Sequence, residues 1–210
     1  MSSPSPREGL QIAGVVLAAG RSSRMAPLNK LLEKIGVEPI VRRVAAVALA
    51  SGAHPIIVVT GHEASRVTEA LKGLEVTTVR NSSYSKGLST SLRAGLGALP
   101  AGIDGAFVCL GDMPEVEGPV LGALMAAFAA NGPRAICVPV RNGRRGNPVL
   151  WGASHFAEIV DISGDNGAKP VIARHEDCVI EVQVLSDSIF ADVDAPQDLI
   201  RLKTKFGARA

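Results

Sequence analysis

The chain has 210 residues, of which 47% are hydrophobic and 20% charged, as in an ordinary globular protein. This length suits one domain with a sizeable core, and an aromatic content of only 3% makes that core aliphatic. The net charge of +2, without a dense run of Lys or Arg, argues against a nucleic-acid-binding surface. No apolar run reaches the length of a membrane span, so no membrane partner is expected. Three cysteines without CxxC spacing predict reduced thiols and a cytoplasmic location.

Helical and strand-like segments alternate along most of the chain. Residues 1–10 are expected to form a disordered tail, and residues 11–210 a single domain. Strands are predicted over residues 12–18, 55–60, 75–79, 106–110 and 135–140. Helices are predicted over residues 39–51, 63–72, 88–99, 117–130 and 195–205. This alternation predicts an α/β fold, with a mostly parallel twisted sheet and helices on both faces.

The alternation changes after residue 140. Residues 141–147 (RNGRRGN) are rich in turn-forming residues and lie between two apolar stretches. They predict a hairpin or a small antiparallel lobe. Residues 179–184 alternate apolar and polar side chains, which is typical of an edge or antiparallel strand.

The first predicted strand runs into a cationic loop of small residues. Residues 15–30 read VVLAAGRSSRMAPLNK. Ala18, Ala19 and Gly20 allow a ligand to approach the backbone closely. Exposed N–H groups and the cations that follow would then face a polyphosphate. The loop matches neither the GxxxxGK[ST] nor the GxGxxG pattern, and the structural alternative is a solvated basic loop.

Polar segments follow three of the predicted strands. They are residues 20–30, 80–90 and 111–114. Because open α/β sheets bind ligands at the carboxyl ends of their strands, we expect these segments to converge on one crevice.

Two carboxylates are candidates for holding a metal ion. Asp112 follows an apolar strand, and its alternative role is in a turn before Pro114. Asp192 and Asp194 are two residues apart, so they point the same way on an extended chain. The alternative for Asp194 is an N-cap, with Gln197 in the capping-box position. Mg²⁺ commonly binds one or two carboxylates together with substrate phosphates.

The histidines are scattered, which suits a reaction that needs no protein nucleophile. A substrate phosphate that attacks a nucleoside triphosphate is already ionised near neutral pH. His54 is expected just before a strand, and His62 and His155 in loops or at the surface. Residues 175–178 (HEDC) resemble a metal cluster, but they offer few zinc ligands at recognised spacing.

Two late segments suggest a site for a second substrate. Residues 143–148 (GRRGNP) place two arginines among glycines, and residues 164–169 (GDNGAK) precede a short helical pattern. Backbone amides of the second segment could hold an anion. The alternative for both is an exposed turn.

The ordered set of LAAGRSSRM with Lys30, GLSTSLRAG, LGDMP, GRRGNPV, GDNGAK and DVDAPQD resembles the MobA/MocA-like nucleotidyltransferases. It is most similar to the molybdenum cofactor cytidylyltransferases. The resemblance spans nearly the whole chain and implies a Rossmann-like nucleotidyltransferase fold with a small hairpin lobe. It also implies Mg²⁺-dependent transfer of CMP from CTP to the phosphate of a molybdopterin-type substrate, with release of pyrophosphate. A molybdenum hydroxylase would be the client enzyme.

The resemblance also implies roles for individual residues. The expected catalytic residues are Arg24, Lys30 and Asp112, and the expected Mg²⁺ ligands are Asp112 and Asp194. Nucleotide binding is expected from Leu17, Ala18, Ala19, Gly20, Arg21, Ser22, Ser23, Arg24, Lys30, Asn81, Ser89 and Ser91. Acceptor binding is expected from Arg145, Gly146, Asn147, Asp165, Gly167 and Lys169.

Specificity within the family depends on a few positions. The CTP-using branch has LAAG where the GTP-using branch has LAGG, so Ala19 favours CTP. The chain departs from the family pattern at Ala26, Ala195 and Lys169. At Lys169 the point charge of an ammonium replaces the usual arginine, whose guanidinium can form two parallel hydrogen bonds. The alternatives are a guanylyltransferase, an enzyme acting on a sugar phosphate or methylerythritol phosphate, and a non-catalytic nucleotide-binding accessory protein for a molybdoenzyme. An NAD-dependent enzyme is disfavoured because the dinucleotide-binding glycines are missing.

Overall fold

The structure is a computed structural model and describes residues 9–165 and 167–207. Most of the expected disordered tail therefore lies outside the described residues. Gly9 and Leu10 are exposed and precede the first strand. None of the helices in these two described ranges is both long and apolar enough to cross a membrane.

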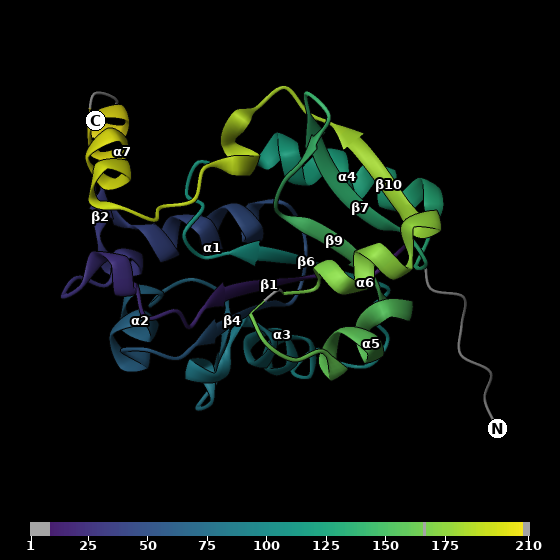
Figure 1. Cartoon of the computed structure of the whole chain (residues 1–210), viewed down its shortest axis with the longest axis horizontal. Helices are drawn as coiled ribbons and strands as arrows, with labels where there is room; N and C mark the ends of the chain where they lie inside the picture. The colour runs from purple at the N-terminus through teal and green to yellow at the C-terminus, as the bar shows by residue number, and fades with distance from the viewer. Residues whose placement is uncertain (1–8, 166, 208–210) are drawn as a thin grey trace.

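A mixed, mostly parallel eight-stranded sheet forms the centre of the molecule (Figure 1). Its order is β10–β7–β9–β6–β1–β4–β5, with β8 paired to β7. β9 is antiparallel to both β6 and β7, and β8 is antiparallel to β7. The other pairs are parallel. The strands are β1 (Ile12–Ala18), β4 (Ile56–Thr60), β5 (Thr77–Arg80), β6 (Gly105–Leu110), β7 (Ile136–Arg141), β8 (Arg144–Arg145), β9 (Val149–Gly152) and β10 (Val179–Gln183).

Helices cover both faces of this sheet (Figure 1). α1 and α4 pack on one face, and α3, α5 and α6 pack on the other. A third apolar cluster joins α7 to Met25, Ile35 of β2 and Ile40 of α1. The helices are α1 (Ile40–Ala50), α2 (Ala64–Ala70), α3 (Leu88–Leu96), α4 (Gly118–Asn131), α5 (Phe156–Asp161), α6 (Lys169–Arg174) and α7 (Pro196–Gly207). The short strands β2 (Lys34–Ile35) and β3 (Glu38–Pro39) form a separate antiparallel pair.

The central strand β1 is buried along its whole length, as its continuous apolar sequence predicts. Its neighbour α3 lies very close to it. A Cβ added at Gly95 would lie 2.4 Å from Cγ1 of Val15, so the helix can approach the strand only because this residue has no side chain.

The predicted α/β class and all of the predicted strands and helices are confirmed, with shifts at their ends. Residues 141–147 form the predicted hairpin between β7 and β8. β10 is an edge strand, but it runs parallel to β7, so the antiparallel alternative is wrong. His155 is only 4% exposed, and its expected surface position is therefore also wrong. It lies beside Trp151, His175 and the carbonyl of Arg134, and the last two are long-range contacts without a local sequence signal.

Candidate functional site

The polar segments after β1, β5 and β6 meet at the carboxyl edge of the sheet. β1 pairs with β4 on one side and with β6 on the other, so the chain order reverses at β1. Ligands bind outside such a reversal point in open α/β sheets. Residues of all three segments, among them Gly20, Tyr84 and Asp112, line one cavity of about 470 Å³. The predicted convergence is therefore present in the structure.

The loop after β1 is closed by its own side chains. Ser22 adopts left-handed backbone angles (φ 54°), and its Oγ accepts a hydrogen bond of 3.1 Å from the backbone N–H of Lys30. The Asn29 Oδ1 accepts a hydrogen bond of 3.1 Å from the N–H of Leu31. These bonds fix the start of the 3₁₀ turn η2 (Lys30–Leu32) and with it the base of the Lys30 side chain.

Lys30 lies between two carboxylates that come from distant parts of the chain. Its Nζ is 2.6 Å from Oδ2 of Asp112 and 3.2 Å from Oδ1 of Asp194. The guanidinium of Arg24 contacts the other oxygen of Asp194. Asp112 follows β6, while Asp194 lies just before α7. A backbone hydrogen bond of 2.9 Å from Val193 N–H to the Asp112 carbonyl joins these two segments.

The charges of this group shift the pKa values of two members. Burial alone would lower the pKa of Lys30, but the charge of Asp112 and hydrogen bonds to Asp112 and Asp194 outweigh it and raise that pKa. Lys30 is therefore a permanent cation at neutral pH. Burial also raises the pKa of Asp192, and the negative charges of Asp194 and Asp112 raise it further. The site is consequently a compact group of carboxylates held around one ammonium.

These carboxylates fit a hard divalent cation. Asp112 and Asp194 direct oxygens at the same point, which the Lys30 ammonium contacts, and Asp192 adds negative charge nearby. One or two carboxylates, completed by water and substrate phosphates, match what Mg²⁺ requires.

Most residues predicted for nucleotide binding line the 470 Å³ cavity, which we call the loop cavity. They are Leu17, Ala19, Gly20, Arg21, Ser22, Ser23, Lys30 and Ser91, together with the predicted catalytic Asp112. Within the described residues, Ala18, Arg24, Asn81 and Ser89 lie outside this lining. Asn81 instead ties the segment after β5 to α3, because its Nδ2 donates to Oγ1 of Thr90 (2.8 Å) and Oγ of Ser91 (3.0 Å). Ser89 is buried, and its N–H donates to the carbonyl of Gly164.

A second cavity of about 300 Å³, which we call the α6 cavity, adjoins the first. Four of the residues predicted for the acceptor line it: Asn147, Asp165, Gly167 and Lys169. Four residues line both cavities: Leu17, Leu88, Leu110 and Asp165. The Oδ1 of Asp165 accepts a hydrogen bond of 3.0 Å from the N–H of Leu88, the first residue of α3. Asn166, in the same predicted segment, lies outside the described residues.

Two residues predicted for the acceptor lie elsewhere. Arg145 pairs with Glu181 at 2.8 Å and with Glu176, so its guanidinium is directed to β10 and the turn before it. A Cβ at Gly146 would lie 2.6 Å from the carbonyl oxygen of Ile189, which makes this glycine a site of close backbone approach. Neither residue is among those that line the α6 cavity within the described chain.

Sequence analysis missed several lining residues. Tyr84 lines the loop cavity, with the Arg21 guanidinium 5.6 Å from its ring centre. Trp151 and Ile172 line the α6 cavity. Tyr84 and Trp151 could have been found from composition, because they are the single tyrosine and the single tryptophan of the chain. Ile172 had no signal, because an apolar residue in a short helix ordinarily indicates packing.

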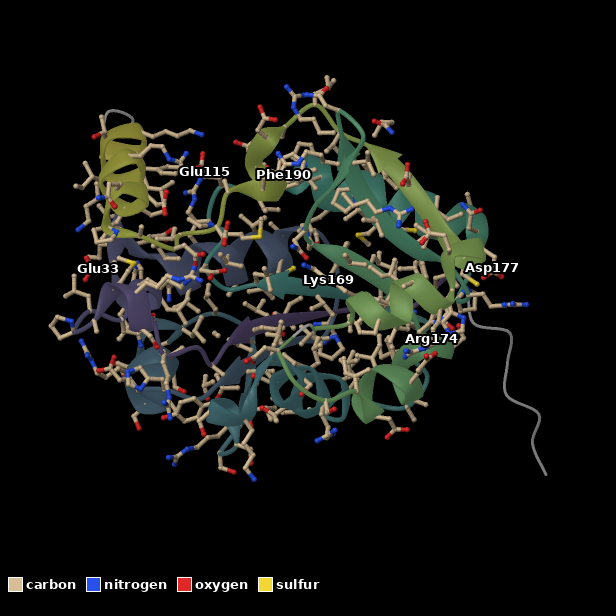
Figure 2. The ribbon with its side chains drawn as sticks, in the orientation of Figure 1. Glu33, Glu115, Lys169, Arg174, Asp177 and Phe190 are labelled. Carbon is tan, nitrogen blue, oxygen red and sulfur yellow. The ribbon has the colours of Figure 1, made fainter. Side chains whose placement is uncertain are left out.

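α7 carries the segment that holds Asp194, and a buried ion-pair group anchors this helix. Figure 2 shows Glu115 beside α7. Its side chain is 6% exposed and contacts Arg201 at 2.7 Å and Lys205. At the start of α7, Asp198 Oδ2 accepts hydrogen bonds from the N–H groups of Asp194 and Ala195. The capping-box partner is thus Asp198 and not Gln197 as predicted.

Glu115→Gln is expected to destabilise the protein by about 1.5–3 kcal/mol at neutral pH, the size of hydrogen bonds to a charged group. Burial would raise the pKa of Glu115, but hydrogen bonds from Lys205 and Arg201 outweigh it and lower the pKa. The stabilisation is therefore present above the unfolded pKa, about 4.3, and is lost as the pH falls through the lowered folded value. Denaturant unfolding at a series of pH values measures this loss.

The control is Glu69→Gln, because Glu69 is 72% exposed and pairs with Lys72 on the surface of its helix. It should change the unfolding free energy by less than about 0.5 kcal/mol. An equal destabilisation by Glu115→Gln at pH 7 and at pH 3 would contradict this role of the carboxylate charge.

Known proteins share this fold. The structure matches a nucleotidyl transferase from Methanothermobacter thermautotroptrophicus with a TM-score of 0.82 and 26% identity, over 96% of this chain and 100% of that one. The architecture is therefore that of a nucleotidyltransferase. The chain belongs to the family described as the MobA-like NTP transferase domain, whose model matches residues 14–179.

Several curated proteins are similar in sequence. The chain is 31% identical to the bifunctional protein GlmU of Micrococcus luteus. The similarity covers 92% of this chain but only 38% of GlmU. It is 26% identical to a probable molybdenum cofactor guanylyltransferase of Natronomonas pharaonis, covering 91% of this chain and 96% of that one. It is 28% identical to the nicotine blue oxidoreductase of Paenarthrobacter nicotinovorans, with the same coverage.

Proposed function

We propose that this protein transfers a nucleotidyl group, CMP from CTP being favoured, to the phosphate of a molybdopterin-type substrate and releases pyrophosphate. The observation that carries the proposal is the pair of adjoining cavities, with Lys30 and Asp112 in the lining of the first. The triphosphate occupies the loop cavity, and the acceptor occupies the α6 cavity. The four residues that line both cavities make the two cavities neighbours, so a bound triphosphate and a bound acceptor would lie next to each other.

In this reaction the protein binds, orients and neutralises charge. The acceptor phosphate is itself the nucleophile, so no side chain has to be deprotonated. Lys30 lies in the loop cavity beside Asp112, and Arg24 contacts Asp194 next to it. These two cations would stabilise the negative charge of the triphosphate. Asp112 and Asp194 are the proposed Mg²⁺ ligands, and the bound cation would neutralise charge on the phosphates.

The acceptor is held by the α6 cavity in this proposal. Lys169, the first residue of α6, supplies a cation, and Asn147 supplies an amide. The Trp151 side chain provides a flat apolar wall of the kind that a fused heterocycle covers. This combination suits an anionic pterin better than it suits a sugar phosphate.

The base preference and the cellular setting are part of the proposal. Ala19 lines the loop cavity and is the residue that favours CTP. The similarity to a probable molybdenum cofactor guanylyltransferase supports GTP as the second candidate. A molybdenum hydroxylase is the proposed client enzyme, residues 11–210 the functional domain, and the cytoplasm the proposed location, since the three cysteines are free thiols.

The test is pyrophosphate release by the full chain with Mg²⁺, a molybdopterin-type cofactor and CTP, GTP or ATP. We expect release with CTP and at least about a tenfold lower kcat/KM with GTP, since one altered contact to the base is worth about 1–3 kcal/mol. A preference for GTP would keep the reaction and overturn the role of Ala19. Release only with a sugar phosphate or methylerythritol phosphate would overturn the acceptor. CTP binding without release under any condition would identify a non-catalytic accessory protein.

A further inference from the structure

The structure brings together a second group of metal-binding side chains, away from the aspartates. His155 ends the 3₁₀ turn η4 (Ala153–His155), Glu158 lies in α5, and His175 follows α6. One ligand atom from each lies within 4.8 Å of the other two. The two imidazole rings are 4.8 Å apart between centroids. Sequence spacing pointed only to residues 175–178, and the fold adds the two ligands that the spacing lacked.

We propose that His155, Glu158 and His175 bind a zinc ion. Two imidazoles and one carboxylate are a three-ligand set that zinc accepts, whereas Mg²⁺ prefers oxygen ligands alone. Asp177 and Cys178 form a separate group with His175 and are not members of this one. The fourth position of the proposed site is therefore open to water.

His155 is already oriented for this role. Its Nε2 lies 2.9 Å from the carbonyl oxygen of Arg134. A carbonyl only accepts hydrogen bonds, so Nε2 is the donor and Nδ1 is the nitrogen that would bind the metal. An imidazole that donates one N–H to a backbone carbonyl and offers the other nitrogen is the usual arrangement at metal sites. The ring is buried, with Trp151 packed edge-on against it.

The other two ligands are joined by a hydrogen bond in the metal-free protein. The Nε2 of His175 lies 2.5 Å from Oε2 of Glu158, and Arg174 contacts the other oxygen. Zinc bound at Nε2 of His175 would replace the hydrogen of this bond, and the neutral imidazole would carry its one proton on Nδ1.

The zinc site lies behind the wall of the α6 cavity. α6 begins at Lys169, which lines that cavity, and ends at Arg174, directly before His175. Figure 2 shows Lys169 near the middle of the molecule, with Arg174 and Asp177 towards its edge. Bound zinc would fasten the end of α6 to α5, and thereby fix the helix that carries the cavity wall. This inference does not depend on the proposed reaction.

The test is calorimetric titration of the full chain with Zn²⁺ in a large excess of Mg²⁺, which occupies oxygen-ligand sites. We expect one zinc ion per chain. Glu158→Gln and His175→Gln should each weaken zinc binding at least about tenfold. Loss of a residue that only supports a metal ligand weakens binding about 10–100-fold, so loss of a ligand itself should cost at least as much. Both side chains are about one third exposed, so neither change opens a cavity in the core. His54→Gln is the matched control, since His54 belongs to neither metal-binding group.

Circular dichroism of the metal-free variants checks that they are folded, and hydrogen exchange adds a second readout. Zinc should slow amide exchange in the segment 169–178 of the wild-type chain and leave it unchanged in His175→Gln. Equal zinc affinity in the wild type and His175→Gln would overturn the site. Zinc binding that is lost in Asp112→Asn but kept in His175→Gln would also overturn it, because the metal would then lie at the aspartates. Failure of the nucleotide assay would leave either zinc result unaffected.

Discussion

Asp112→Asn is expected to lower the rate of pyrophosphate release at least about a hundredfold, the effect of removing one preorganised electrostatic contact at a reacting centre. Asparagine keeps the shape of the side chain but removes the charge that pairs with Lys30 at 2.6 Å and that would hold Mg²⁺. The Asp112 carbonyl still accepts the hydrogen bond from Val193 N–H, so the segment before α7 stays attached. Steady-state kinetics with saturating CTP and a series of Mg²⁺ concentrations measures the loss.

The matched control for this change is Asp187→Asn. Asp187 is 74% exposed and pairs with Arg141 on the surface. It should retain the wild-type rate, while thermal melts show that both variants are folded. Wild-type rates for Asp112→Asn at saturating Mg²⁺ would show that the metal binds elsewhere.

Lys30→Ala is the second change with a large expected effect, and it should act on both binding and stability. Loss of the ammonium should weaken CTP binding at least about tenfold, since hydrogen bonds to charged groups are worth about 1.5–3 kcal/mol. It also leaves Asp112 and Asp194 without their shared cation. A fully buried pair broken in this way costs about 3–5 kcal/mol, and partial exposure of these aspartates reduces the expected cost to about 1–3 kcal/mol. Calorimetric titration with CTP and denaturant unfolding measure the two effects.

The effect of Mg²⁺ on stability distinguishes the role of Lys30 in neutralising the aspartates from its role in binding CTP. Because the variant lacks the ammonium that Asp112 and Asp194 share, Mg²⁺ should raise its melting temperature more than it raises that of the wild type. Lys72→Ala is the control, since Lys72 is 78% exposed and pairs only on the surface. An unchanged CTP affinity in Lys30→Ala would place the triphosphate away from the loop after β1.

Local patterns predicted the part of the fold that depends on neighbours in sequence. The strand Ile12–Ala18 is found with its predicted limits, because a continuous apolar run fits a strand that is covered on both faces. The position of β9 could not be predicted in this way. It lies antiparallel between β6 and β7, and its pairing with β6, such as Gly105 with Gly152, joins segments that are far apart in the chain.

The candidate site shows the same division. Lys30 and Asp112 were predicted from the loops that follow strands, and the structure brings them to 2.6 Å. The direction of Arg145 was not predictable, because its carboxylate partners Glu176 and Glu181 follow more than 30 residues later. The burial of His155 likewise depends on long-range contacts, with His175 and with the carbonyl of Arg134.

The shared lining of the two cavities has a consequence for what happens after bond formation. Under the proposed reaction, two molecules enter by separate cavities, but the product is one molecule that extends through both. While one half of the product stays bound in its cavity, it keeps the other half at a high effective concentration near the second cavity. The product is therefore released only when both halves have dissociated. Such a product leaves slowly on its own. A recipient protein that binds one end of the product would speed its release from this protein. Direct transfer of the product to that recipient protein would then follow from the shape of the site.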